Sequence, residues 1–233
     1  MCLARGMLMD PRSQGWTVDV DPSLPEVSPL LLVVKRPEDG WPVIDEYDLN
    51  KRLKAIRDSV DLEELRAEPA VQAYRDFYWK LGIDPTKKRP AGEALARRVL
   101  QGKPMPKINP IVDIYNLVSA ETRIAIGGYN LATLTSYCPD KVLRLCPATK
   151  GEHFLGIGMS DPVLLKGNQV VFMAGKLPFA IFPYRDGYQT KINGDDKAVL
   201  FALEDVPGLP DGLLERTADL LLTSLGIDPS TYL

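Results

Sequence analysis

Two different spacings of hydrophobic residues occur along the chain. From residue 46 to residue 100, apolar positions such as Leu49, Leu53 and Ile56 recur every three or four residues. That spacing puts them on one face of an α-helix and leaves polar residues on the other face. The predicted helices span residues 48–60, 61–81 and 90–100, with Gly102 as the expected stop of the third.

Beyond residue 140 the apolar residues come in short runs, which Gly, Asn and Asp separate in the manner of strands joined by turns. The predicted strands span residues 30–35, 142–146, 169–174, 179–184 and 198–203. Residues 212–225 predict a last amphipathic helix. This order of elements indicates an α+β fold, in which helices of the N-terminal half pack on a largely antiparallel β-sheet of the C-terminal half.

A further helix is predicted to begin at Asn109, because Asn caps free backbone N–H groups and Pro110 suits a first helical turn. Residues 111–118 are apolar on nearly every side of this helix, except at Asp113 and Asn116. Such a helix is buried, so its carboxylate and amide need partners or a polar pocket. Asn109, Asp113 and Asn116 share one stripe and are candidate site residues. The alternative is that they only cap the helix and hold nearby backbone.

The composition suits a folded domain, since 45% of the 233 residues are hydrophobic and 25% are charged. The cysteines Cys2, Cys138 and Cys146 form no close pair and no cluster with histidine, so we expect no disulfide, no metal and no cofactor. We find no signal-peptide pattern and no apolar run long enough to span a bilayer. The prediction is a cytoplasmic protein without a membrane partner.

Positive charge is concentrated between residues 80 and 107, where eight basic residues stand against two acidic ones in a chain of net charge −3. A basic strip of this kind suits an RNA backbone, whose phosphates it would neutralise. A solvated loop and helix face explains the same charges equally well. The candidate RNA-binding residues are Lys87, Lys88, Arg89, Arg97, Arg98, Lys103 and Lys107.

The segment from Lys107 to Ser119 resembles the Ile-Asn-x-Val-Val-Asp-x-x-Asn segment of the phenylalanyl-tRNA synthetase beta chain. There the segment belongs to the tRNA-editing region called the B3/B4 domain, and this chain is more similar to free-standing relatives of that domain. Looser similarities follow at residues 128–131, 142–144, 150–152 and 198–204. Together they cover about residues 60–206. The resemblance predicts an N-terminal arm with one strand at 1–45, a B3/B4-like domain at 46–206, and a C-terminal helix packed on it at 207–233.

The resemblance implies that the protein binds tRNA or aminoacyl-tRNA and hydrolyses the ester of a wrongly charged amino acid in trans. In that interpretation Asn109 orients water or the substrate amine, and Asp186 and Thr190 help to place them. The implied substrate-binding residues are Asp113, Asn116, Gly127, Gly128, Tyr129 and Arg185. The expected pocket lies between the start of the Asn109 helix, a turn at 127–130 and the segment 184–190.

One departure from the family matters for catalysis. The family's editing histidine is replaced by Gly127 or Gly128, and the single histidine, His153, follows Glu152 in a position typical of a surface residue. Two alternatives therefore stay open: a non-catalytic nucleic-acid-binding module, and a pocket protein for a free amino acid or similar metabolite. The basic segment favours RNA over a metabolite. We do not expect a complete synthetase, because the chain is short and shows no ATP-binding signature.

Overall fold

The computed structural model describes residues 10–24 and 26–232. The helices are α1 (Glu46–Ser59), α2 (Pro69–Lys80), α3 (Ala91–Leu100), α4 (Pro110–Thr122), α5 (Leu131–Tyr137) and α6 (Leu213–Ser224). The strands are β1 (Thr17–Val20), β2 (Leu30–Lys35), β3 (Ile126–Asn130), β4 (Val142–Pro147), β5 (His153–Phe154), β6 (Val163–Leu164), β7 (Val170–Ala174), β8 (Leu177–Phe182), β9 (Arg185–Asp186) and β10 (Ala198–Leu203). Short 3-10 helices are η1 (Pro11–Ser13), η2 (Glu64–Ala67) and η3 (Pro229–Tyr232).

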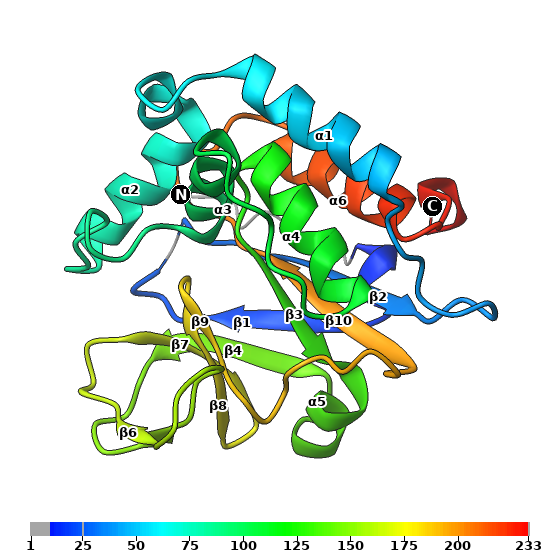
Figure 1. Ribbon diagram of the computed structural model, residues 1–233. Helices are drawn as coiled ribbons and strands as arrows, with labels where there is room; N and C mark the ends of the chain where they lie inside the picture. Colours follow the sequence, from blue (N-terminus) through cyan, green and yellow to red (C-terminus); the bar gives the residue numbers. More distant parts are fainter. Residues whose placement is uncertain (1–9, 25, 233) are drawn as a thin grey trace.

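The helices α1, α2, α3, α4 and α6 form a layer on one side of the strands (Figure 1). The strands form a five-stranded sheet in the order β1-β4-β7-β8-β9, a three-stranded sheet in the order β2-β10-β3, and the pair β5-β6. Only β1 pairs with its neighbour β4 in parallel, and the other ladders of the described residues are antiparallel. The predicted α+β class is confirmed.

Helix α4 lies on the three-stranded sheet, as its apolar face predicted. The side chains of Ile111, Ile114 and Val118 are fully buried in the core that also holds β10. Tyr115 meets Phe201 of β10 edge to face, with ring centroids 5.9 Å apart. The buried face of α4 therefore fixes where the first turn of this helix stands relative to the sheets.

Two sequence predictions on the N-terminal half need correction. The arm at 1–45 was expected to hold one strand, yet β1 forms as well, because its four residues pair with β4 from Thr17–Val142 to Val20–Leu145. The predicted helix 61–81 is split into η2 and α2. Pro69 stands at the start of α2 and holds Glu68 in an extended conformation, which interrupts the helix there.

Residues 127–130 were expected to form a turn, and they are instead the main part of strand β3, paired with β10. The helix that follows, α5, was not predicted. Asn130 caps it by accepting a hydrogen bond from the backbone N–H of Thr133 at 2.7 Å. At the other end of the chain, α6 packs against α4. That packing supports our proposal that residues 207–233 belong with the unit at 46–206.

Candidate functional site

The amide of Asn109 is engaged at both of its polar atoms. Its Oδ1 accepts a hydrogen bond from the backbone N–H of Val112 at 3.1 Å, which is the predicted helix cap. Its Nδ2 donates to the backbone carbonyl of Ile192 at 3.4 Å. Asn109 therefore joins the start of α4 to the segment that follows β9. Its role towards a substrate stays a prediction.

The other two residues of the α4 stripe are less enclosed than the sequence suggested. Asp113 is half-buried and accepts a hydrogen bond from the backbone N–H of Ile108 at 2.8 Å. Asn116 is also half-buried, and within 10–24 and 26–232 its side chain has no hydrogen-bond partner. The polar stripe thus borders the surface, because α4 is covered by other elements only on its remaining sides.

The two glycines of β3 make room for side chains and leave no opening between them. A Cβ atom at Gly127 would lie 2.2 Å from the hydroxyl oxygen of Tyr129. A Cβ atom at Gly128 would lie 2.6 Å from Cδ1 of Ile192 and 3.0 Å from Cε1 of Tyr115. The space beside both glycines is therefore occupied, and Gly127, Gly128 and Tyr129 are all buried, while the pocket expected here stays a prediction.

Tyr129 reaches the carboxyl group of Asp186. Its hydroxyl donates to Oδ1 of Asp186 at 2.8 Å, and its ring packs edge to face on Phe179 with centroids 4.8 Å apart. Asp186 is half-buried, and this burial raises the pKa of its carboxyl to about 6, while the hydrogen bond from Tyr129 acts in the opposite direction. A carboxyl group that titrates this close to neutral pH is a recognised sign of a functional site.

A second buried acid, Glu204, was not singled out from the sequence. Its side chain is 5% exposed, and its Oε2 has no hydrogen-bond partner among the described residues. Burial raises the pKa of Glu204 well above its usual range, and the charge of Asp186 raises it further. In the sequence Glu204 reads only as the polar end of an apolar strand, so no local pattern marked it.

Thr190 lies deeper than a residue that contacts substrate would. Its side chain is fully buried, and its hydroxyl donates to the carbonyl of Gly187 at 3.5 Å. Its own carbonyl accepts from the backbone N–H of Asn130 at 2.9 Å. In this conformation the hydroxyl of Thr190 has no access to solvent and holds the 184–190 segment against β3, so its direct role towards a substrate stays a prediction.

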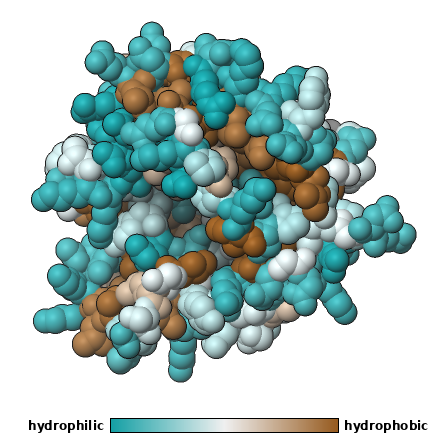
Figure 2. Space-filling model, in the orientation of Figure 1, coloured by the Kyte–Doolittle hydropathy of each residue, from teal (hydrophilic) through white to brown (hydrophobic). Residues whose placement is uncertain are grey.

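An open cleft of about 610 Å³ lies beside β9, and Tyr184 and Arg185 line it. Its opposite wall is the loop after α2, which contributes Lys87 and Lys88. Its remaining lining comes from residues 154–170, around β5 and β6, and from Ile181 and Phe182 of β8. Figure 2 shows the surface hollowed between the helical layer and the β6 region, with a brown apolar area over β6.

Of the basic residues predicted from the 80–107 segment, two line this cleft, namely Lys87 and Lys88. Arg89 is 3.9 Å from the buried carboxylate of Glu93. Nε of Arg98 donates to the carbonyl of Pro104. Arg97 is half-buried on α3, whereas Lys103 and Lys107 are exposed on the loop before α4. The cleft is instead lined also by Lys166 and Arg185, from distant parts of the sequence.

Replacing Gly127 with Ala should lower the free energy of unfolding by about 1–3 kcal/mol, because the new methyl group would displace the Tyr129 hydroxyl from Asp186. Gly194→Ala is the matched control, since its Cβ would meet only Cβ of Asn109 at 3.6 Å, which is an ordinary van der Waals distance. Urea denaturation of both variants measures the difference. Equal stabilities for the two variants would show that the Tyr129 ring has room to move.

Within residues 10–24 and 26–232, no three His, Cys, Asp or Glu side chains converge as metal ligands would. The same residues include no helix that is long and apolar enough to cross a membrane. The polar groups described above are the carboxyl groups of Asp186 and Glu204, the amide of Asn109, and the cations of the cleft.

Comparisons with known proteins relate the chain to a family model and to solved structures. A family model described as the B3/4 domain matches residues 73–208. Among solved structures, the chain is similar to the crystal structure of an N-terminal fragment of the phenylalanyl-tRNA synthetase beta-subunit from Pyrococcus horikoshii. The two share 12% sequence identity over 84% of this chain and 73% of that chain, with a TM-score of 0.40. The curated proteins contain no match to the chain.

Proposed function

We propose a function that starts from one finding, which is that this chain belongs to the B3/4 domain family. The protein binds tRNA and clears mischarged aminoacyl-tRNA by hydrolysing the ester. The observation that carries the proposal concerns strand β9, whose two residues, Arg185 and Asp186, have different surroundings. Arg185 lines the basic cleft, whereas Asp186 holds a carboxyl of raised pKa against Tyr129. The proposed RNA-binding surface and the proposed proton-transfer group thus come from adjacent residues of β9.

Hydrolysis of an aminoacyl ester adds water to the carbonyl carbon and breaks the bond to the ribose oxygen. The products are the free amino acid and the ribose hydroxyl of the tRNA. Asp186 suits the role of the group that orients this water and accepts its proton, because a pKa of about 6 leaves most of the carboxyl ionised at pH 7. The same proton can pass to the leaving ribose oxygen. Asn109 orients the water or the substrate amine, and positioning supplies the rest of the rate.

RNA binding should depend on the cations of the cleft. Replacing Lys87, Lys88 and Lys166 together with Ala should weaken tRNA binding at low salt, because fewer counterions are released from the RNA. The slope of log affinity against log salt should fall by about 0.7–0.9 for each phosphate that the variant no longer neutralises. Fluorescence anisotropy of labelled tRNA, titrated at several salt concentrations, measures both quantities.

The matched control removes the same charge elsewhere. Lys51, Lys54 and Lys197 are exposed and do not line the cleft. Their triple replacement with Ala should leave the salt slope closer to that of the parent. If the two triple variants lose affinity equally, the cleft has no special part in RNA binding, and the electrostatic attraction is general.

A second candidate is RNA binding without catalysis. Two observations favour it: glycine stands where the family has its editing histidine, and the side chain of Tyr129 fills the space beside Gly127. In that case the cleft alone would carry the function, and Asp186 would only anchor Tyr129. The two candidates differ in one measurable property, which is turnover on a mischarged tRNA.

A further inference from the structure

The cleft beside β9 combines features that belong to one class of ligand. Four cations line it: Lys87, Lys88, Lys166 and Arg185. The one acidic residue of the lining, Asp84, accepts hydrogen bonds from its own loop at Thr86 and lies 3.9 Å from Lys87. The surplus of positive charge therefore favours an anionic ligand.

Two of these cations are held in place. Nζ of Lys88 lies 4.4 Å from the centre of the Tyr184 ring. Nη1 of Arg185 donates to the carbonyl of Ile157 at 3.2 Å, and a Cβ atom at Gly156 would come within 2.5 Å of Cδ of Arg185. The stem of Arg185 thus lies in space that only glycine leaves free, and its guanidinium keeps further N–H groups for a ligand.

The other lining residues are apolar or carry amides. Phe154, Ile181 and Phe182 are almost fully buried, and Val163 and Leu164 are 41% and 58% exposed. Asn168 is exposed, and Oε1 of Gln169 accepts from the backbone N–H of Lys166 at 2.8 Å, which leaves its NH₂ group as a donor. Amides suit the edges of an unpaired base, apolar surface suits its faces, and cations suit a phosphate.

We propose that this cleft binds one unpaired nucleotide, with the phosphate on the lysines and Arg185 and the base against the apolar lining. The inference rests on the proposed function for its choice of RNA as the source. A volume of about 610 Å³ has the size of a small-molecule site, so it accommodates a nucleotide, whereas a paired helix is too wide to enter. The cleft thereby selects single-stranded ends or splayed bases.

The test measures binding of adenosine 5′-monophosphate, adenosine, inorganic phosphate, a short single-stranded oligoribonucleotide and its blunt duplex to the whole protein by calorimetry. We expect the monophosphate to bind at least tenfold tighter than adenosine or phosphate, and the single strand tenfold tighter than the duplex. A single strand that outcompetes the monophosphate identifies an RNA end as the source. Equal affinities of strand and monophosphate identify a free nucleotide, and both results support the cleft.

Variants connect binding to the cleft. Lys88→Ala and Lys166→Ala should each weaken monophosphate binding about tenfold, as should Leu164→Ser, which changes an exposed side chain and leaves the core intact. Lys51→Ala is the control and should bind like the parent. Parent-like binding by all three cleft variants overturns the inference, as does failure of both the monophosphate and the single strand to bind.

The two proposals fail in distinguishable ways. If the parent and the cleft variants bind tRNA with the same affinity and also bind the monophosphate with the same affinity, the cleft inference is overturned while RNA binding survives. If the monophosphate binds in the cleft and tRNA does not bind at all, the nucleotide site stands and the proposed function falls.

Discussion

Replacing Asp186 with Asn should make the protein more stable at pH 8, by about 3 kcal/mol. Burial raises the pKa of Asp186 from 3.8 to about 6, so the folded protein binds this proton more tightly than the unfolded chain does. Stability from Asp186 is fully present below pH 3.8 and is lost as the pH rises through 6. The Asn side chain keeps an oxygen that accepts the Tyr129 hydrogen bond and carries no charge at any pH.

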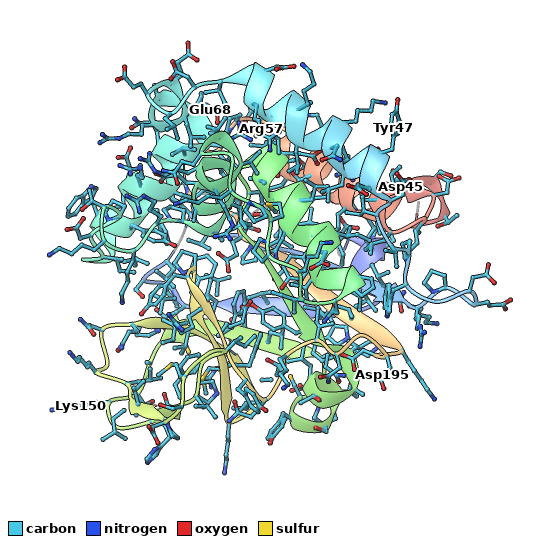
Figure 3. All side chains as sticks on the ribbon, viewed as in Figure 1. Asp45, Tyr47, Arg57, Glu68, Lys150 and Asp195 are labelled. Atoms are coloured by element: carbon cyan, nitrogen blue, oxygen red, sulfur yellow. The ribbon has the colours of Figure 1, made fainter. Side chains whose placement is uncertain are left out.

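Urea denaturation of parent and variant between pH 4 and pH 8 tests this sign. The difference in unfolding free energy should be near zero at pH 4 and should grow towards pH 8 in favour of the variant. Asp195→Asn is the control, because Asp195 is exposed at the surface (Figure 3). A variant that is less stable than the parent at pH 8 would show that the charged form of Asp186 stabilises the fold.

Replacing Arg75 with Ala should lower the free energy of unfolding by about 3–5 kcal/mol. Arg75 of α2 donates from Nε and Nη2 to the two carboxylate oxygens of Glu93 in α3, at 2.9 and 3.0 Å. The side chain of Glu93 is 1% exposed, so removal of Arg75 leaves a buried charge without its main partner. Arg89, at 3.9 Å, compensates only in part, so a value near 3 kcal/mol is expected.

Two further variants separate the loss of a buried partner from the loss of an ion pair in general. Lys54→Ala removes an exposed pair with Asp58, whose side chains are 72% and 61% exposed, and should cost less than 1 kcal/mol. The double change of Arg75 to Met and Glu93 to Leu should recover much of the stability, because it leaves no unpaired charge. Arg75→Ala within 1 kcal/mol of the parent would contradict the argument.

The parts of the fold that follow from local signals could be predicted from the sequence. The Asn109 cap and the buried face of α4 depend on neighbouring residues, and both are present in the structure. Strand β1 could not be predicted in this way, because it is held by β4, more than a hundred residues away. The glycines of β3 were expected in a turn, whereas in the structure Tyr129 and Ile192 occupy the space beside them.

The same distinction between local and long-range signals applies to the residues of the candidate site. Asp186 was singled out through the family resemblance, but its raised pKa depends on burial that the sequence does not display. Glu204 escaped notice because its burial comes from the tertiary structure. For example, the hydroxyl of Tyr74, in α2, donates a hydrogen bond to the backbone carbonyl of Glu204, although the two residues are 130 positions apart in the sequence. Lys166 and Arg185 line the same cleft as Lys87 and Lys88 only because the folded chain brings distant segments together.

Asp186→Asn, compared with the control Asp195→Asn, can distinguish a catalytic from a purely structural role of Asp186. A residue that only anchors Tyr129 should be replaceable by Asn without loss of function. A residue that transfers a proton should lose a factor of about one hundred or more in rate when replaced by Asn, even where the variant is the more stable protein. Gain of stability together with loss of turnover is the pattern expected of a functional group kept in an unfavourable environment.

The most direct test of the proposed function is single-turnover deacylation of a panel of mischarged tRNAs by the parent, Asp186→Asn and Asp195→Asn proteins at pH 7. The proposal predicts that the parent and Asp195→Asn clear at least one ester well above the spontaneous rate, and that Asp186→Asn clears it about a hundredfold more slowly. A parent protein that clears none of the esters above the spontaneous rate would contradict the hydrolase proposal, as would an Asp186→Asn variant that turns over at the parent rate.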